Sequence, residues 1–356
     1  MKRIIFCSAV MATFIIDNPQ CGGNRVDRAQ IAAIYLDNDH YNQALIEAHR
    51  ALREEGPQTD LQLIVALAHM GLEENLAALE VLANAIAFDP TNDRLHSALR
   101  TLCEKKSILM EARSALEELR NTTPSHAATL ATAGWIELQL EQESRSIALL
   151  DSAIALDPDY LYARVERSRI ASKNADLVRT ESELRAALRI APNQPHLLVA
   201  LGEALLKQTN TASADSAFTQ ALLHDDSINI AAHIAHIYSE QKRTEKAIEY
   251  YERAIERAPE DAQLLNNLAW SYAETGIELE RATRLSLLSL QLDGENPIYM
   301  DTYAELLYLQ KHYTRAFAVI RRALDIESRH QQSEYSDYLR EQHEKMKNTL
   351  GPRVSM

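Results

Sequence analysis

The stretch DSAIALDPDYLYAR, residues 151–164, holds an alanine and a proline five positions apart, and this spacing decides the fold. Similar helix endings stand before and after it, in NAIAFDP (84–90), AALRIAP (186–192) and RAIERAP (253–259). Proline cannot continue a helix, because it lacks a backbone N–H and its ring blocks the preceding turn. A chain that restates one helix ending at a regular interval is expected to repeat a whole helical unit.

Alignment on this spacing gives a period of 34 residues, with one residue missing near Ser227 and one extra near Ile277. The eighth, twentieth and twenty-seventh places of the unit are mostly alanine, glycine or serine, which lets two antiparallel helices approach closely. Each unit is therefore predicted to be a helical hairpin. The nine units begin near Arg25, Thr59, Asp93, Ala127, Leu161, Pro195, Ile228, Ala262 and Pro297.

Composition supports a helical chain and excludes several classes of protein. Only 9 glycines, 10 prolines and 6% aromatic residues occur among 356 residues, which leaves little material for sheets. The formal charge is −14 and no basic run occurs, so nucleic acid is not expected as a partner. Cys7, Cys21 and Cys103 form neither a disulfide framework nor a zinc-binding pattern, and Cys103 is expected to be a buried thiol.

The segments IAHIYSEQKRTEKAIEYYERAIERAP (234–259) and NNLAWSYAETG (266–276) resemble the tetratricopeptide repeat family, and the resemblance covers about residues 25–330. It implies an all-α, right-handed superhelical solenoid of about nine helix-turn-helix units, formed by residues 24–330. Residues 331–350 are expected to form a C-terminal capping helix with Ser333 as its N-cap, and residues 351–356 a tail. Arg100 stands where a small residue is expected and Glu137 where an aromatic one is expected, which predicts looser packing in the third and fifth units than in the seventh and eighth.

Residues 1–23 have the three-part layout of a secretory signal peptide or membrane-targeting segment, with a basic start, an apolar run from Ile4 to Ile16 and a polar end. As a helix the run would span about 20 Å, which is short of the ~30 Å hydrocarbon core of a bilayer. Cleavage before Asn24 and acylation of Cys21, as in a bacterial lipoprotein, both stay open. The expected location is the periplasm or the membrane of a bacterial envelope. The alternative is a cytoplasmic protein that keeps the run as a hydrophobic first helix.

The sequence contains no GxSxG, HExxH, CxxC or phosphate-binding glycine loop, so neither catalysis nor a cofactor is expected. His233, His236 and Glu240 would share one helical face, as metal ligands can. We interpret them as ordinary surface groups and predict no metal.

In the family that the chain resembles, the second, fifth, ninth and twelfth places of each first helix face the ligand. Trp135 and Trp270 both occupy the ninth place, where each could anchor a partner or fill a gap between helices. Leu63, Leu67 and Met70 could line the groove, but a place in the core is favoured for them. The groove set is Leu63, Leu67, Met70, Trp135, Leu138, Tyr162, Arg169, His233, His236, Asn266, Asn267, Trp270 and Tyr308.

These features predict a non-catalytic scaffold that binds a protein or peptide partner in its concave groove, in an envelope assembly, secretion or polysaccharide system. The alternatives are a cytosolic adaptor and an accessory subunit of an envelope glycan-modifying complex. The family's carboxylate clamp is missing, because Ala29 and Ala33 stand where its first polar groups would be. A chaperone tail is therefore not the expected ligand.

Overall fold

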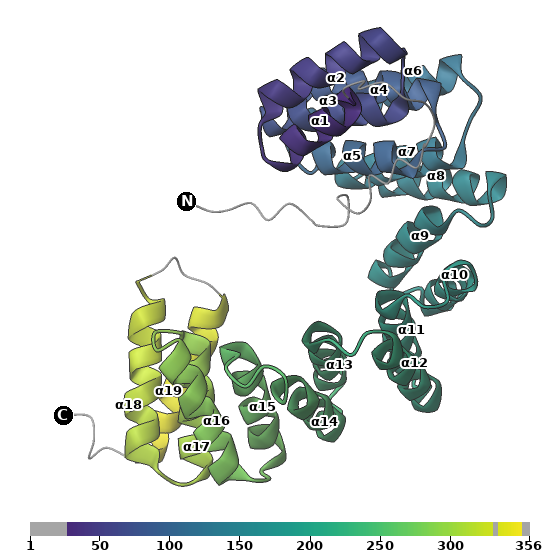
Figure 1. Cartoon of the computed structure of the whole chain (residues 1–356). Helices are drawn as coiled ribbons and strands as arrows, with labels where there is room; N and C mark the ends of the chain where they lie inside the picture. The colour runs from purple at the N-terminus through teal and green to yellow at the C-terminus, as the bar shows by residue number, and fades with distance from the viewer. Residues whose placement is uncertain (1–26, 330–333, 351–356) are drawn as a thin grey trace. The chain divides into compact units, whose positions relative to one another are not determined.

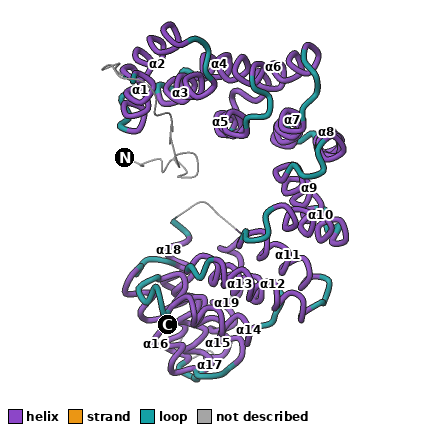
Figure 2. The backbone as a smooth tube through the Cα atoms, turned by 45° about the vertical axis from the view of Figure 1, so that its right-hand side comes forward, coloured by secondary structure: helices purple, strands orange, loops and turns teal. Residues whose placement is uncertain are grey.

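The computed structural model describes residues 27–329 and 334–350, and within these ranges it contains helices and loops but no strand (Figure 1, Figure 2). The chain divides into two compact units between Ile190 and Ala191. Each unit is a stack of helical hairpins, so the all-α solenoid fold is confirmed. Residues 1–26, which include Cys7 and Cys21, lie outside the described residues, as do Ser333 and the tail.

The first unit holds five hairpins and one short 3-10 helix. Its elements are α1 (Arg28–Asp37), α2 (Tyr41–Glu55), α3 (Thr59–Gly71), α4 (Asn75–Phe88), α5 (Asp93–Cys103), η1 (Lys106–Ile108), α6 (Leu109–Thr122), α7 (Ala127–Gln139), α8 (Glu143–Leu156), α9 (Leu161–Lys173) and α10 (Leu177–Ile190).

The second unit holds four hairpins and one final helix. Its elements are α11 (Pro195–Lys207), α12 (Thr211–His224), α13 (Ile228–Glu240), α14 (Thr244–Ile255), α15 (Ala262–Thr275), α16 (Leu279–Leu292), α17 (Pro297–Leu309), α18 (Tyr313–Glu327) and α19 (Glu334–Leu350).

The first helix of every hairpin from α3 onward begins at the predicted start of its repeat. The start of α1 is later than predicted, at Arg28, because the Asp27 side chain accepts a hydrogen bond from the Gln30 backbone N–H at 3.0 Å and caps the helix there. Pro195 and Pro297 occupy the first position of α11 and α17, where a missing N–H costs no helical hydrogen bond.

In seven of the nine described hairpins the two helices are joined by a turn with one residue in the left-handed region. Such a residue reverses the chain within a few positions, and it is usually glycine. In seven units of this chain, the residue at the fifteenth place has a positive φ although it is not glycine. These residues are Asp39, Glu73, Glu141, Ala175, Thr209, Lys242 and Lys311. In the eighth unit the left-handed residues are Gly276 and Glu278, on either side of the extra residue near Ile277.

Small residues at the eighth place bring the paired helices together, as predicted. Ala66, Ala235 and Ala304 are fully buried in this way. Gly202 is the tightest case in the second unit, because a Cβ atom added there would lie 2.4 Å from Cε1 of the buried Phe218 ring on α12. The side chain at this place therefore sets the distance between α11 and α12.

Successive first helices lie closer to one another than successive second helices do. In the first unit α1, α3, α5 and α7 each contact the next first helix, and in the second unit α11 contacts α13 and α15 contacts α17. Among second helices such contact occurs between α4 and α6. The first helices therefore form the inner face of each unit, and the second helices form the outer face.

The final helix, α19, packs on α18 and covers the end of the second unit (Figure 1). Leu339 and Met346 are fully buried in a core cluster with Met300, Leu307 and Ile320. These two side chains form part of the face of α19 that packs on the last hairpin. Within residues 27–329 and 334–350, none of the helices combines the length and apolar character that a membrane span requires.

Candidate functional site

The inner face of the first unit is hollowed between α5 and α9, above α7. We call this the α5–α9 cleft, and its volume is about 720 Å³. Three of the predicted groove residues meet in it, namely Trp135, Tyr162 and Arg169. The other lining residues are Asp93, Ser97, Arg100, Thr101, Glu104, Asp159, Tyr160, Leu161, Val165 and Glu166.

Side chains of α5 and of the segment that starts α9 meet across α7 in this cleft. The Arg100 guanidinium lies over the Tyr162 ring, 3.8 Å from its centroid, and the Tyr160 hydroxyl donates to Asp93 at 2.7 Å. These two contacts connect α5 with the start of α9. Ala131 of α7 is fully buried in a core cluster with residues of α8 and α9.

A buried hydrogen-bond network sets the direction of Arg100. His96 Nε2 lies 3.0 Å from the Pro90 carbonyl oxygen and Nδ1 lies 3.1 Å from Thr132 Oγ1, to which Arg100 Nη1 donates at 3.1 Å. Burial lowers the pKa of His96 to about 4, so its ring is neutral near pH 7. The Nε2 hydrogen then bonds Pro90, the Thr132 hydroxyl donates to Nδ1, and the Thr132 oxygen accepts from Arg100.

The wall of the α5–α9 cleft formed by α9 carries an ion pair at its surface. Glu166 is buried, and its carboxylate accepts from Arg169 Nη1 at 2.9 Å. Burial raises the pKa of Glu166 despite the two nearby arginines, Arg169 and Arg100. The Arg169 side chain is 69% exposed, so it remains accessible to a partner.

A second hollow lies on the inner face of the second unit, between α13 and α15. We call it the α13–α15 cleft, and its volume is about 510 Å³. Four of the predicted groove residues line it, namely His233, His236, Asn267 and Trp270. The remaining lining residues are Ile228, Asn229, Ala232, Ser239, Tyr251, Asp261, Gln263 and Leu264. Tyr251 comes from the second helix α14, is buried, and bonds Asn267, so it closes the bottom of the cleft.

The lining of the α13–α15 cleft combines an indole, two imidazoles, amides and the carboxylate of Asp261. Trp270 is half-buried, whereas His233 and His236 are exposed. Asp261 caps α15 by accepting from the Leu264 N–H at 2.9 Å, which leaves its second carboxylate oxygen for other donors.

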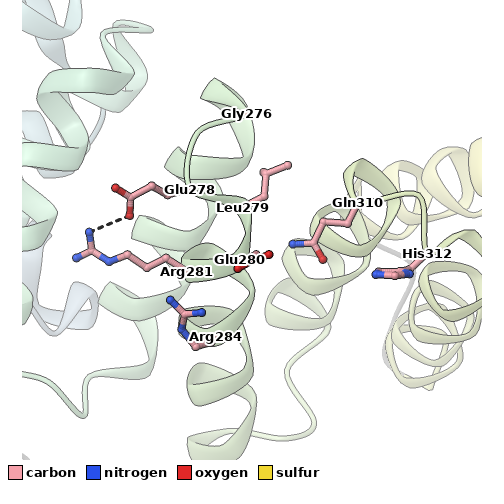
Figure 3. Close-up of a pocket in the computed structure, with 8 residues that line it drawn as sticks. All are labelled: Gly276, Glu278, Leu279, Glu280, Arg281, Arg284, Gln310 and His312. Carbon is pink, nitrogen blue, oxygen red and sulfur yellow. Dashed lines mark hydrogen bonds and ion pairs between the residues drawn. The ribbon is translucent and has the colours of Figure 1, made fainter.

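A third hollow lies beside the turns that precede α16 and α18. Its lining residues are Gly276, Glu278, Leu279, Glu280, Arg281, Arg284, Gln310 and His312, and Figure 3 shows them around the space. Arg281 Nη1 reaches back to Glu278 at 3.3 Å and to Glu252 at 2.8 Å. This hollow contains none of the predicted groove residues. We therefore regard the two inner clefts as the candidate sites.

The structure corrects part of the predicted groove. Leu63 and Met70 are 1% and 8% exposed and belong to the core cluster around α4 and α5, so they do not line a surface. Leu67 is half-buried against the same core cluster, and Leu138 is half-buried against the cluster formed by α7, α8 and α9. Tyr308 packs beneath α19, where its hydroxyl lies 3.0 Å from Thr349 Oγ1.

Asn266 and Asn267 separate, although they are adjacent in the sequence. Asn267 lines the α13–α15 cleft, whereas Asn266 is buried and its Oδ1 has no hydrogen-bond partner. An extended peptide therefore cannot meet both amides on the same surface. This corrects the placement of Asn266 in the groove.

Sequence reasoning missed several residues that shape the clefts, above all Arg100, His96, Tyr160 and Tyr251. Arg100 did carry a signal, because it broke the run of small residues at the eighth place. That signal suggested looser packing, whereas the side chain turns to the inner face and stacks on Tyr162. Tyr251 carried no such signal, because a tyrosine on a second helix is ordinary core material.

The histidine pair of α13 does not assemble a metal site. His236 Nε2 lies 3.3 Å from Glu240 Oε1, and both side chains are exposed. Within the part of the chain that the structure describes, no three histidine, cysteine or acidic residues are grouped as metal ligands would be. The single described cysteine, Cys103, is buried as predicted, and burial raises the pKa of its thiol to about 12.

Comparison with known proteins matches parts of this chain to proteins built from one type of helical repeat. Residues 228–261 and 250–283 match the tetratricopeptide repeat family. Over 253 residues, 65% of this chain, the sequence is 24% identical to tetratricopeptide repeat protein 21B of Xenopus laevis, and the match spans 18% of that relative's length.

Two solved structures show similarity at lower identity. The C-terminal part of a TPR repeat-containing protein from Cytophaga hutchinsonii is 17% identical with a TM-score of 0.46, covering 77% of this chain and 98% of that one. Yeast Tom70 is 14% identical with a TM-score of 0.46, covering 92% of this chain and 90% of that one.

Proposed function

The chain is a tetratricopeptide-repeat protein, and on that premise we propose that it is a non-catalytic scaffold whose inner face binds a segment of a partner protein. Repeat solenoids use the face lined by their first helices as an extended binding surface. Each of the two inner clefts lies on that face of its own unit. Each is open to solvent, as binding of a peptide or helix requires, and neither is an enclosed cavity for a small substrate.

One observation carries the proposal. Trp135 and Trp270 stand at the same place of their repeats, and each lines the inner cleft of its own unit while remaining half-buried. A half-buried indole is held in one orientation by its neighbours and still offers part of its surface. Tryptophan is the residue type most enriched among interface positions whose truncation costs about 2 kcal/mol or more.

The proposed location is the bacterial envelope, with residues 1–23 acting as the targeting segment and Cys21 as the lipidation candidate. The basic and apolar order of these residues supports this proposal. Mass spectrometry of the mature N-terminus tests it. An acyl mass that disappears in Cys21→Ser identifies a lipoprotein, an unmodified start at Asn24 identifies a soluble exported protein, and an intact Met1 contradicts export.

Site-specific photocrosslinking in the native cell tests the scaffold proposal. A benzoylphenylalanine is placed at position 135 or 270 on the inner face, or at position 288 as a control. Leu288 is an exposed residue of α16 on the outer face. The same partner is expected to crosslink from both inner positions and not from position 288. Crosslinks from position 288 alone would place the interaction on the outer face and contradict the proposal.

Alanine variants separate binding from folding. Trp135→Ala and Trp270→Ala are expected to weaken capture of the crosslinked partner about tenfold or more, with the thermal midpoint close to that of the wild type. Loss of folding in either variant would mean that the indole fills the core.

A further inference from the structure

A chain of ion pairs crosses the fifth hairpin, which consists of α9 and α10. Glu183 of α10 pairs with Arg164 of α9 at 2.8 Å and with Arg179 at 2.9 Å. Arg179 also pairs with Asp151 of α8 at 3.0 Å, and Asp151 pairs with Arg167 of α9 at 2.9 Å. The side chains of Glu183, Arg164 and Arg167 are at most 15% exposed, so these charges lie inside the contact between the helices.

Arg167 occupies a place that holds an aliphatic or aromatic residue in each of the other eight units. It is the seventh place of the repeat, and the other residues there are Ile31, Val65, Leu99, Ala133, Leu201, Ile234, Leu268 and Tyr303. A mostly buried ion pair adds little net stability, because the cost of removing both charges from water offsets most of their attraction. The fifth hairpin therefore has charge pairing where the other units have an apolar side chain.

The fifth hairpin also buries little apolar surface. Among the second to eighth hairpins, which all lie within the described residues, it has the fewest buried apolar side chains larger than alanine, namely Ile170 and Leu184. The second hairpin has eight, which are Leu61, Leu63, Ile64, Val65, Met70, Leu79, Leu82 and Ile86. Burial of apolar surface is the main term that stabilises a folded segment, so the fifth hairpin is expected to open most readily among these seven.

Helix α9 is one wall of the α5–α9 cleft. Five of its residues line that cleft, namely Leu161, Tyr162, Val165, Glu166 and Arg169. The opposite wall belongs to α5, whose Arg100 stacks on the Tyr162 ring. If the fifth hairpin opens, the cleft loses the α9 wall together with this stacking contact, and only the residues of α5 and α7 remain.

We propose that the fifth hairpin opens and closes as one element while the other four hairpins of the first unit stay folded, and that each opening takes the α5–α9 cleft apart. A partner segment that binds between α5 and α9 then stabilises the closed hairpin, because it binds only when both walls are present. This coupling to a partner rests on the proposed scaffold function, whereas the opening itself does not.

Hydrogen exchange with mass spectrometry on the full chain tests the opening. After correction for intrinsic rates, the backbone amides of α9 and α10 are expected to exchange at least about tenfold faster than those of α3 and α4. The amides of the neighbouring helices α7 and α8 should also exchange more slowly than those of α9 and α10. Equal exchange across all five hairpins of the first unit would overturn the proposal.

Three substitutions test whether the ion pairs set the opening. Glu183→Gln leaves the mostly buried Arg164 without its carboxylate partner and is expected to speed exchange in α9 and α10 about tenfold or more. Arg167→Leu supplies an apolar side chain, leaves Asp151 with its other arginine, and should slow exchange there about threefold or more. Arg185→Gln removes an exposed charge from α10 and, as the matched control, should change exchange by less than about twofold.

Two results with these variants would contradict the proposal. Equal effects of Glu183→Gln and Arg185→Gln would show that the buried ion pairs do not set the opening. Faster exchange throughout the first unit in Glu183→Gln would show that the fifth hairpin does not open by itself.

The fluorescence of Trp135 tests whether the cleft depends on the hairpin. Trp270→Phe leaves Trp135 as the single indole of the chain, and this variant is unfolded in increasing urea. We expect the Trp135 emission to change in a first step, together with the loss of exchange protection in α9 and α10 and ahead of the main transition. Adding Glu183→Gln should move this first step to lower urea. Emission that changes only in the main transition would overturn the dependence of the cleft on the hairpin.

The opening and the scaffold proposal can fail separately. Equal exchange in all hairpins removes the opening, and the crosslinks from positions 135 and 270 still decide the scaffold proposal. If the hairpin opens and no partner crosslinks from position 135, the coupling to a partner is overturned and the opening stands.

Discussion

Asp301 is a single carboxyl group at the contact between the last hairpin and α19. It is 6% exposed, accepts a hydrogen bond from Tyr338, and has Glu305 and Lys345 near it. Burial, followed by the charge of Glu305, raises the pKa of Asp301 to about 7. The protonated carboxyl is therefore the form that the folded contact favours.

This shift predicts that stability falls as pH rises from about 4 to about 7, because the folded state keeps a proton that the unfolded chain has released. The slope from one such group is at most about 1.4 kcal/mol per pH unit. Asp301→Asn, which stays neutral, should remove that part of the slope in urea unfolding, whereas exposed Asp325→Asn should keep it. Parallel slopes in wild type and Asp301→Asn would contradict the prediction.

At the scale of the helix pair, the contact of Gly202 with Phe218 shows how the repeat controls helix spacing. A methyl group at Gly202 would have to displace a ring that is itself fully buried. Overpacking of this kind costs about 1–3 kcal/mol.

We expect Gly202→Ala to lower the unfolding free energy by that amount, measured by chemical denaturation. Phe218→Leu frees space, so the double variant should lose less than the two single losses combined. Additive losses would mean that the two side chains do not compete for the same space.

Helix starts could be predicted from the sequence almost to the residue, because proline and the small places recur with one period. The burial of individual side chains could not be predicted in this way. Met70 and Trp135 both stand at face positions of their helices, yet Met70 is buried by α4 and α5 while Trp135 is half-exposed. Their exposure depends on how far apart successive first helices lie, which local sequence does not specify.

At the scale of the whole chain, stability in a repeat array is a sum of local terms between neighbouring hairpins. The division between Ile190 and Ala191 has no sign in the sequence, because the period of 34 residues continues across it without a missing or extra residue. Helix α19 ends the second unit, where it buries Leu339 and Met346 against α17 and α18.

A chain that stops after Arg329 lacks α19. The backbone amides of α17 and α18 should then exchange hydrogen faster, whereas those of α13 and α14 should exchange as slowly as before. The burial of two large apolar side chains is worth about 3–6 kcal/mol, which is enough to open one hairpin. Hydrogen exchange with mass spectrometry measures this, and a chain that stops after Leu350 is the control. Uniform loss across the second unit would show that its hairpins unfold together.

The unequal neighbour contacts of first and second helices have a mechanical consequence. Further curling of a unit compresses side chains that already touch, whereas straightening draws the outer helices into the space between them. Each unit should therefore resist an increase of its curvature more strongly than a decrease. A load pulling along the array would be taken up elastically before any hairpin came apart.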